Sequence, residues 1–275
     1  MMRKTVHLIK GGAMSRKHSS GLLCLALILA ITFGLAASES VDVEQYRAEA
    51  VKRWEKEVEK LEARDEVENH PDDSILFVGS SSIRRWEAIT TDMAPYHPIQ
   101  RGFGGSKWSD VAVFAERLIT PHKFRGVVFF VANDIVGGEG DKTPEQVARL
   151  FAYVLGKVRE HNPTVPVFFI AVTPTPRRWK AWSQSRAANT AVRLVCNRSE
   201  NTYFIGTESI FLDEAGKPRP ELFVEDQLHQ NRNGYILWAA AIKSHLDAVL
   251  DGVKWSYLPP IPRQPSFPRP ATAAE

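Results

Sequence analysis

The chain has 275 residues, 44% of them hydrophobic, which is enough apolar material for one α/β domain with extensions or for two small domains. Its formal charge of +3 is misleading, because five of the 35 basic residues and no acidic residue precede Gly21. The remaining 30 basic residues stand against 32 acidic ones, and such a nearly neutral chain gives no support for a nucleic-acid partner.

Residues 1–38 have the pattern of a secretory signal, with a basic start, an apolar run from Leu22 to Ala37 and small residues at 36–38 where a peptidase could cut. The apolar run also reaches the lower length limit of a membrane-spanning helix, so an uncleaved anchor over 22–37 is the alternative. We therefore expect an exported protein, periplasmic or secreted, with or without this anchor. Beyond the signal Cys196 is the only cysteine, which excludes an internal disulfide.

The segment 39–72 is predicted to be an amphipathic helical lead-in to the main domain. Between Val41 and Glu68, apolar residues recur every three or four positions, at Val51, Trp54, Val58 and Leu61. Pro71 disfavours continuation of the helix. We expect a largely solvated helix that packs a narrow apolar stripe on the domain.

The main domain, 73–252, is predicted to alternate strands with helices. Short apolar runs predict five strands, at Ile75–Val78, Ile99–Phe103, Val127–Val131, Val165–Val172 and Tyr203–Ile205. Helices are predicted between them, at about Ser109–Ile119, Thr143–His161 and Ser183–Asn197, with a last one after Asn231–Gly234 that ends near Leu250. This alternation indicates a parallel sheet covered on both faces. The six prolines of 253–275 predict a disordered tail.

Polar or glycine-rich loops follow three of the predicted strands, at Ser80–Ser82, Gly104-Gly105 and Asn133-Asp134. Because the carboxyl ends of parallel strands share one edge of the sheet, these loops should lie near one another. One of the three serines is then a candidate nucleophile. Its own backbone N–H, an N–H of the glycine turn and the Asn133 amide are candidate donors to an oxyanion.

A further candidate is the loop before the last helix, which holds Asp226 and His229. An acid three residues ahead of a histidine can orient the imidazole, which then acts as general base to a serine. Each feature alone has a commoner explanation, since a serine turn usually caps a helix and an isolated Asp-x-x-His is usually a surface pair. Only the combination predicts acyl transfer.

In their order and spacing, four blocks resemble those of the SGNH (GDSL-like) hydrolases, and the resemblance covers about residues 73–250. The blocks are Phe77–Ser82, Arg101–Gly105, Ala132–Asp134 and Asp226–His229. The resemblance implies a flavodoxin-like three-layer α/β/α sandwich with a five-stranded parallel sheet. It also implies a serine esterase.

Carried over residue by residue, the resemblance makes Ser81 the nucleophile and His229 with Asp226 the base pair. It assigns the oxyanion hole to Ser81, Gly105 and Asn133. Two positions depart from the family pattern.

Ser80 stands where the family usually has an acid before the nucleophile, so the choice of Ser81 rests on its spacing from Gly79. Val131 stands where a glycine usually lies two residues before Asn133, which would tighten the pocket or shift the loop. Neither departure removes a group that transfers protons.

No cofactor is expected, because the chain has no P-loop, no dinucleotide fingerprint and no metal-binding histidine spacing. Trp179 and Arg178, on the loop after the fourth predicted strand, are candidate substrate-binding residues, with Trp179 as a pocket wall. The short loops leave little room for a lid, which favours short acyl chains.

The sequence thus predicts an exported serine esterase that hydrolyses short-chain, acetyl-type carboxylic esters, including esters of carbohydrates, through an acyl-enzyme. Its partners would be small-molecule or glycan esters, and a membrane only if the N-terminal segment stays uncleaved. A lysophospholipase or thioesterase is the alternative enzyme. A catalytically inactive carbohydrate-binding relative is the alternative from another class. The oligomeric state is left open.

Overall fold

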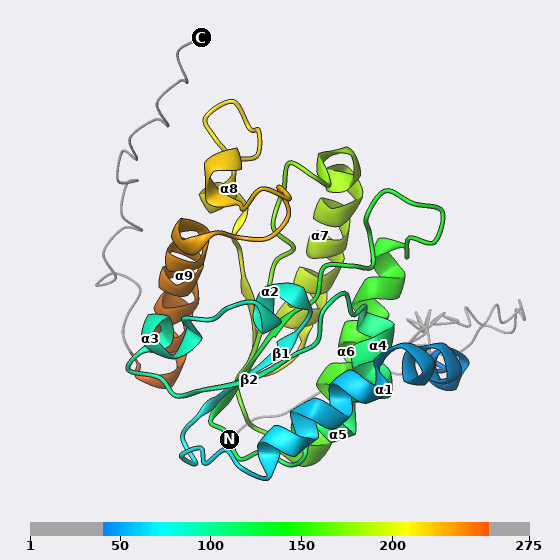
Figure 1. Cartoon of the computed structure of the whole chain (residues 1–275), viewed down its shortest axis with the longest axis vertical. Helices are drawn as coiled ribbons and strands as arrows, with labels where there is room; N and C mark the ends of the chain where they lie inside the picture. Colours follow the sequence, from blue (N-terminus) through cyan, green and yellow to red (C-terminus); the bar gives the residue numbers. More distant parts are fainter. Residues whose placement is uncertain (1–40, 253–275) are drawn as a thin grey trace, which may run out of the picture. The chain divides into compact units, whose positions relative to one another are not determined.

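The computed structural model describes residues 41–252, which belong to one compact unit built around a parallel sheet. The five strands lie in the order β2-β1-β3-β4-β5. Their bounds are β1 Ile75–Gly79, β2 Pro98–Gly102, β3 Gly126–Phe130, β4 Val167–Ile170 and β5 Thr202–Ile205. All five predicted strands are therefore present, and their parallel pairing is confirmed (Figure 1).

β4 is shorter than the predicted run Val165–Val172. Pro166 lies before its start and has no N–H to give to a sheet. At the other end, the backbone N–H and C=O of Val172 bond to the Asn189 side chain instead of a neighbouring strand. The loop that follows β4 is thereby fixed to the helix that carries Asn189.

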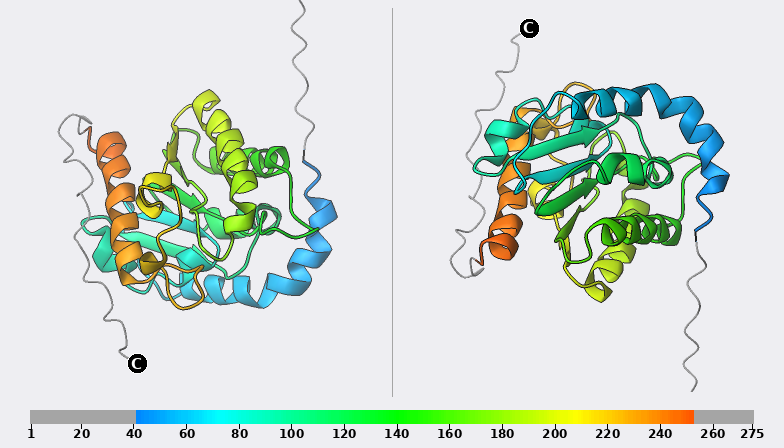
Figure 2. Two further views of the ribbon diagram at one scale, coloured as in Figure 1. Left: turned by 90° about the horizontal axis from the view of Figure 1, so that it is seen from above. Right: turned by 90° about the horizontal axis from the view of Figure 1, so that it is seen from below.

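Helices cover both faces of the sheet, as Figure 2 shows from two sides. Their bounds are α1 Glu44–Asp65, α2 Ser81–Arg84, α3 Ile89–Met93, α4 Trp108–Val113, α5 Ala115–Ile119, α6 Pro144–His161, α7 Trp182–Arg198, α8 Glu208–Phe211 and α9 Arg232–Leu250. Alternate residues of β1 point to opposite layers: Leu76 and Val78 pack with α1, α6 and α7, while Ile75 and Phe77 pack with α3 and α9. The predicted three-layer α/β/α sandwich is confirmed.

The two long helices predicted from their N-terminal signals begin where those signals stand. Thr143 and Gln146 form a reciprocal capping box ahead of α6. Asn231 accepts hydrogen bonds from the first backbone N–H groups of α9. The helix predicted over 109–119 is instead broken at Phe114 into α4 and α5. The short helices α3 and α8 had no periodic signal long enough to predict them.

α1 is fixed to the sheet more firmly than a solvated lead-in. It packs on α4 and α5 and buries Trp54, Val58 and Leu61. At its end the fully buried Arg101 of β2 donates hydrogen bonds to Asp65 and Glu68.

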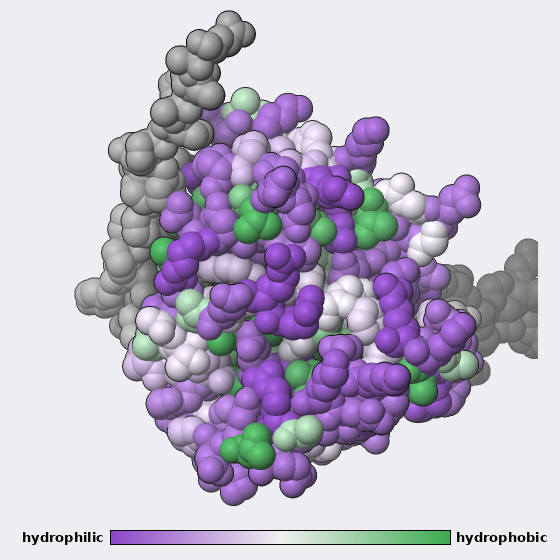
Figure 3. Space-filling view, viewed as in Figure 1, coloured by the Kyte–Doolittle hydropathy of each residue, from purple (hydrophilic) through white to green (hydrophobic). Residues whose placement is uncertain are grey.

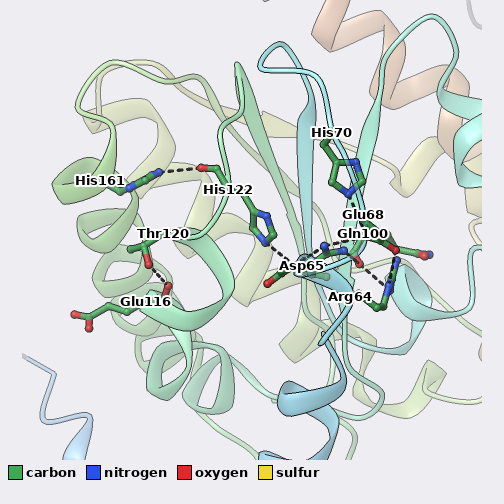
Figure 4. A network of polar contacts seen from close by, with 10 residues as sticks. Arg64, Asp65, Glu68, His70, Gln100, Glu116, Thr120, His122 and His161 are labelled. Carbon is green, nitrogen blue, oxygen red and sulfur yellow. Dashed lines mark hydrogen bonds and ion pairs between the residues drawn. The ribbon is translucent and has the colours of Figure 1, made fainter. Parts of the chain in front are cut away.

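Figure 4 shows how these acids join a wider polar network. Glu68 also accepts a hydrogen bond from Arg64 and contacts His70, and His122 lies beside Asp65. Although burial opposes ionisation, the donors around Glu68 hold its pKa at about 2, well below its ordinary value of 4.5. The carboxylate is therefore charged over the whole physiological range.

The predictions for 1–38 and 253–275, a signal or anchor and a disordered tail, lie outside the described residues. Within 41–252, none of the helices combines the length and apolar character needed to cross a membrane.

Candidate active site

The register of the sheet brings three candidate loops to one edge. Gly79, the last residue of β1, is paired with Gly102 at the end of β2 and with Phe130 at the end of β3. The loops that follow the three strands therefore leave the sheet at the same level, as expected for a parallel sheet. A Cβ on Gly79 would stand 2.0 Å from the Phe130 carbonyl oxygen, so only glycine allows the chain to turn here so close to β3.

The three serines of the first loop have different surroundings. Ser80 is 1% exposed, and its carbonyl accepts the first hydrogen bonds of α2. Ser82 is buried, and its carbonyl accepts a hydrogen bond from the Tyr235 hydroxyl. Ser81 opens α2 and is partly exposed to solvent. It is the serine whose hydroxyl meets the histidine predicted as its base.

Ser81, His229 and Asp226 form a continuous chain of hydrogen bonds. Ser81 Oγ lies 2.8 Å from His229 Nε2, and His229 Nδ1 lies 2.6 Å from Asp226 Oδ2. Both contacts are satisfied when Nδ1 carries the proton and donates it to the carboxylate, since Nε2 then accepts from the serine hydroxyl. This is the arrangement of nucleophile, base and orienting acid that acyl transfer requires.

The loop that carries the acid and the base is closed on itself. Val224 N–H donates to the His229 carbonyl, and Asp226 Oδ1 accepts from the backbone N–H groups of Leu228 and His229. Burial opposes ionisation of Asp226, but these hydrogen bonds and the one from the imidazole lower its pKa to about 2. Asp226 is therefore ionised at neutral pH and well into the acid range.

Arg85, from the turn after α2, is a neighbour of this pair that sequence reasoning missed. Its Nη1 lies 3.0 Å from His229 Nδ1 and 3.6 Å from Asp226 Oδ2. Because Nδ1 already carries a proton toward Asp226, the attraction of Arg85 is to the carboxylate. The Arg85 side chain is 45% exposed, so this ion pair is screened by water.

Asn133 is held at both ends of its amide. Its Nδ2 donates to the Ser106 carbonyl at 3.0 Å, and its Oδ1 accepts from Arg178 Nη2 at 2.7 Å. These partners fix which end of the amide is the donor, because an arginine can bond only to the oxygen. The second N–H of Nδ2 remains available to an oxyanion.

Arg178 uses both of its terminal nitrogens to hold the β3 loop, so it is not free to bind substrate with both. Its Nη1 donates to the Ala132 carbonyl at 2.7 Å while Nη2 holds Asn133. Burial lowers the pKa of the guanidinium from its ordinary value, an effect that Asp141 opposes. Arg178, which is predicted to bind substrate, thus holds the Asn133 amide in position.

Asp134, the next residue, ties the same loop to the one after β2. Both of its carboxylate oxygens accept from the Trp108 N–H at the start of α4, and Lys142 lies 3.1 Å away. Burial raises the pKa of Asp134, while Lys142 and the Trp108 N–H oppose the rise. With the bond from Asn133 to Ser106, two consecutive side chains fasten the β3 loop to the β2 loop.

Gly105 precedes Ser106, whose carbonyl accepts the hydrogen bond from Asn133, but Gly105 is not part of the wall of the cleft. It adopts a left-handed conformation, with φ of 82°, and a Cβ there would stand 3.3 Å from the Trp54 ring. Among residues 41–252 its N–H and that of Ser81 have no acceptor. Both are therefore unused donors at the same edge of the sheet, consistent with an oxyanion hole.

A cleft of about 490 Å³, counted out to its open mouth, lies between the ends of β3 and β4 and the His229 loop. Its walls include the serine turn, Asn133, Arg178 and His229. The aromatic wall is Trp182, at the start of α7, rather than the predicted Trp179. Trp179 is stacked on Trp182 at 6.3 Å between ring centroids, and one turn of 3-10 helix separates the two residues.

The geometry can now be compared with known proteins. The sequence model of the GDSL-like Lipase/Acylhydrolase family matches residues 73–237 of the chain, which is more than half of it. The chain belongs to this family. It is a carboxylic ester hydrolase.

Solved structures similar to this hydrolase include three that share its fold. A putative platelet activating factor from Streptococcus pneumonia has a TM-score of 0.63 at 15% identity, with 74% of this chain and 97% of the other covered. A GDSL-like lipase from Bacteroides thetaiotaomicron has a TM-score of 0.59 at 15% identity, with 69% and 97% covered. A carbohydrate esterase family 3 protein from Talaromyces cellulolyticus has a TM-score of 0.51 at 19% identity, with 66% and 100% covered. No curated protein matches the hydrolase in sequence.

Of the two departures from the family pattern, Ser80 lies beside Ser81 in the wall of the cleft, and Val131 lies in the core. Ser80 makes no side-chain hydrogen bond to the start of α2. Val131 is buried in the core layer that contains α6 and is not part of the wall of the cleft. Within 41–252, no group of three or more His, Cys, Asp or Glu side chains is placed to bind a metal ion.

Proposed function

We propose that the hydrolase cleaves short-chain carboxylic esters through an acyl-enzyme formed on Ser81. The observation that carries the proposal is the hydrogen-bond chain from Ser81 through His229 to Asp226, with distances of 2.8 and 2.6 Å. It supports proton removal from the Ser81 hydroxyl at the moment of attack.

In the first half-reaction, Ser81 Oγ attacks the ester carbonyl carbon and its proton passes to His229 Nε2. Asp226 stabilises the imidazolium without itself taking the proton. The imidazolium then protonates the leaving alkoxide as the carbonyl–oxygen bond breaks, which releases an alcohol and leaves the acyl group on Ser81. In the second half, His229 takes a proton from water, the resulting hydroxide adds to the acyl carbon, and Ser81 leaves with that proton.

Negative charge develops on the carbonyl oxygen in both halves. The free N–H of Asn133 and the backbone N–H groups of Ser81 and Gly105 are the donors assigned to it. Loss of one such donor typically costs about 10²–10³-fold in kcat. Arg178 keeps the Asn133 donor oriented.

The volume of the cleft and the polarity of one face of the molecule support small substrates. The empty space of about 490 Å³ includes the open mouth of the cleft, so the enclosed part is smaller. The face seen in Figure 3 is mostly hydrophilic, with apolar side chains in small separate patches. This face therefore offers no broad apolar surface on which a lipid aggregate could adsorb. We expect acetyl to butyryl esters to be hydrolysed fastest, and faster turnover of decanoyl esters would contradict the assignment.

Export remains part of the proposal. It rests on the signal pattern of residues 1–38, and the lack of a second cysteine after it is compatible with export. The carbohydrate esterase among the structural neighbours makes glycan acetates one class of substrate to test.

The test is hydrolysis of p-nitrophenyl acetate by the full chain, beside Ser81→Ala and the matched control Ser82→Ala. We expect activity in the wild type and in Ser82→Ala, and a loss of at least about 10⁴-fold in Ser81→Ala. Equal loss in both variants would assign the effect to the turn rather than to a nucleophile. An inactive wild type would exclude acetyl esters.

A further inference from the structure

Gln227, which lies between the acid and the base in the chain, has a backbone conformation that glutamine rarely adopts. Its φ is 56°, in the left-handed region, and within 41–252 Asn201 is the only other residue besides glycines with a positive φ. This conformation is costly for a residue with a long side chain and persists only where the surrounding structure enforces it. Such residues are concentrated at active sites, where the conformation serves the mechanism.

Two other segments of the chain hold Gln227 in this conformation. Its backbone N–H and its side-chain Nε2 both donate to the Val224 carbonyl, at 2.9 and 3.2 Å. Its carbonyl accepts a hydrogen bond from the Arg177 backbone N–H at 3.0 Å, which joins the tip of the His229 loop to the loop after β4. Gln227 thus uses both of its backbone polar groups and its side-chain amide to keep one conformation.

The turn at Gln227 allows Asp226 to meet His229. Asp226 Oδ1 accepts hydrogen bonds from the backbone N–H groups of Leu228 and His229, both at 2.9 Å, and Oδ2 lies 2.6 Å from His229 Nδ1. A side chain can reach backbone groups two and three residues further along only if the chain turns back directly after it. An extended Gln227 would carry His229 away from the carboxylate.

The two ends of the same loop are closed by contacts that do not involve Gln227. Val224 N–H donates to the His229 carbonyl at 2.9 Å, and Phe223 is paired with Gln230 in an antiparallel bridge. These contacts fix where the loop begins and ends, and the conformation of Gln227 decides how its tip is folded. A change at Gln227 should therefore disturb the contact between Asp226 and His229 without releasing the loop.

We propose that Gln227 is a positioning residue for the general base. Its left-handed conformation, held by Val224 and Arg177, sets the hydrogen bond between Asp226 and His229 and thereby aims His229 Nε2 at Ser81. Gln227 is not part of the wall of the cleft, so it acts through His229 and not on the substrate. The inference rests on the proposed esterase function and adds a residue to the machinery of that site.

The test compares Gln227→Val with Gln227→Asn in the full chain. Valine is branched at Cβ and opposes the left-handed conformation, whereas asparagine tolerates it. With p-nitrophenyl acetate, we expect kcat of Gln227→Val to fall by about tenfold or more at nearly constant KM, and Gln227→Asn to recover most of this loss. Wild-type kcat in Gln227→Val, or an equal loss in both variants, would overturn the proposal.

Asn201→Val is the matched control, because Asn201 has a φ of 48° and lies just before β5, whereas Ser81 follows the opposite, carboxyl end of β1. The substitution imposes the same strain there, so we expect a lower Tm and an unchanged kcat. An equal fall in kcat at both positions would assign the effect to the stability of the fold. All variants are assayed well below their Tm, and Gln227→Ala, which opposes the conformation less than valine, repeats the comparison with a smaller expected loss.

Proton NMR of the free enzyme separates this proposal from the proposed function. The proton between His229 Nδ1 and Asp226 Oδ2 lies in a short, charge-assisted hydrogen bond, so its resonance is expected far downfield. We expect this resonance in the wild type, Gln227→Asn and Asn201→Val, and its loss or an upfield shift in Gln227→Val. That pattern would support the positioning role even if the wild type hydrolysed no ester. An unchanged resonance in Gln227→Val would refute the role whatever the activity.

Discussion

The base side and the oxyanion side of Ser81 are built in different ways. His229 and Asp226 come from one short loop, where the carboxylate is bound by two backbone N–H groups and the imidazole of its own segment. Asn133, in contrast, is positioned by groups 27 and 45 residues away, the Ser106 carbonyl and Arg178. The base pair is therefore a local structure, and the proposed oxyanion hole is a product of the tertiary fold.

The difference teaches which substitutions act directly and which act at a distance. A change in the His229 loop removes a group that moves or stabilises a proton. A change on the oxyanion side can disturb catalysis through residues that never touch the substrate.

The largest effect expected from a change on the local side is that of Asp226→Asn. The amide oxygen can still accept the two backbone N–H groups, but its NH₂ cannot accept from His229 Nδ1, so the imidazole loses its orientation. We expect kcat to fall by about 10³–10⁴-fold with little change in Tm, measured with p-nitrophenyl acetate and by thermal unfolding. The control is Glu225→Gln, an exposed neighbour on the same loop. A loss of less than about tenfold would show that Asp226 does not orient the base.

On the tertiary side, Asn133→Ala removes one oxyanion donor and leaves the other two. Its expected cost is about 10²–10³-fold in kcat, with KM nearly constant, because the donor acts mainly in the transition state. A rise in KM at unchanged kcat would instead assign Asn133 to ground-state binding.

Much of the fold could be predicted from sequence, because the five strands are short apolar runs and the main helices carry clear N-terminal signals. The serine turn, Asn133, Asp226 and His229 could be singled out because each follows a predicted strand or precedes a predicted helix, and the family resemblance chose Ser81 among the three serines. The hydrogen bond from Arg178 to Asn133 could not be predicted, because nothing in the sequence pairs Arg178 with a residue 45 positions away. Trp179 was preferred to Trp182 as the aromatic wall because the turn of 3-10 helix between the two residues is not evident in the sequence.

A smaller effect should follow from removing the hydrogen bond between Arg178 and Asn133. Arg178→Met leaves Asn133 Oδ1 without its donor, and we expect a fall in kcat of about 10-fold or more with a smaller change in KM. Arg178→Lys keeps a cation but cannot bond Ala132 and Asn133 in the same geometry, so it should restore only part of the rate. A full rescue by lysine would show that charge alone matters. The double variant Arg178→Met with Asn133→Ala should be little worse than Asn133→Ala, because both act through one donor.

The smallest effect on activity is expected from replacing Glu68, which links the end of α1 to Arg101 of β2. This replacement should instead change the stability of the fold. The folded-state pKa of Glu68 is about 2, below its ordinary 4.5, so its stabilisation is present above pH 4.5 and is lost as the pH falls toward 2. Glu68→Gln should lower the free energy of unfolding at pH 7 by on the order of 1–3 kcal/mol and flatten its decline in acid.

The matched control for that prediction is Glu66→Gln, two residues away and exposed. Denaturant unfolding of both variants at several pH values gives the comparison. Parallel pH profiles for wild type and Glu68→Gln would contradict the role of Glu68 in fixing α1.

The central claim, an acyl-enzyme on Ser81, is tested most directly by trapping it. The full chain is mixed with p-nitrophenyl acetate, quenched with acid within the first turnovers, digested and analysed by mass spectrometry. We predict one acetyl group on the peptide from the β1–α2 turn, at Ser81, and none in Ser81→Ala. Acetylation at Ser82, or an adduct that persists on this peptide in Ser81→Ala, would contradict the account.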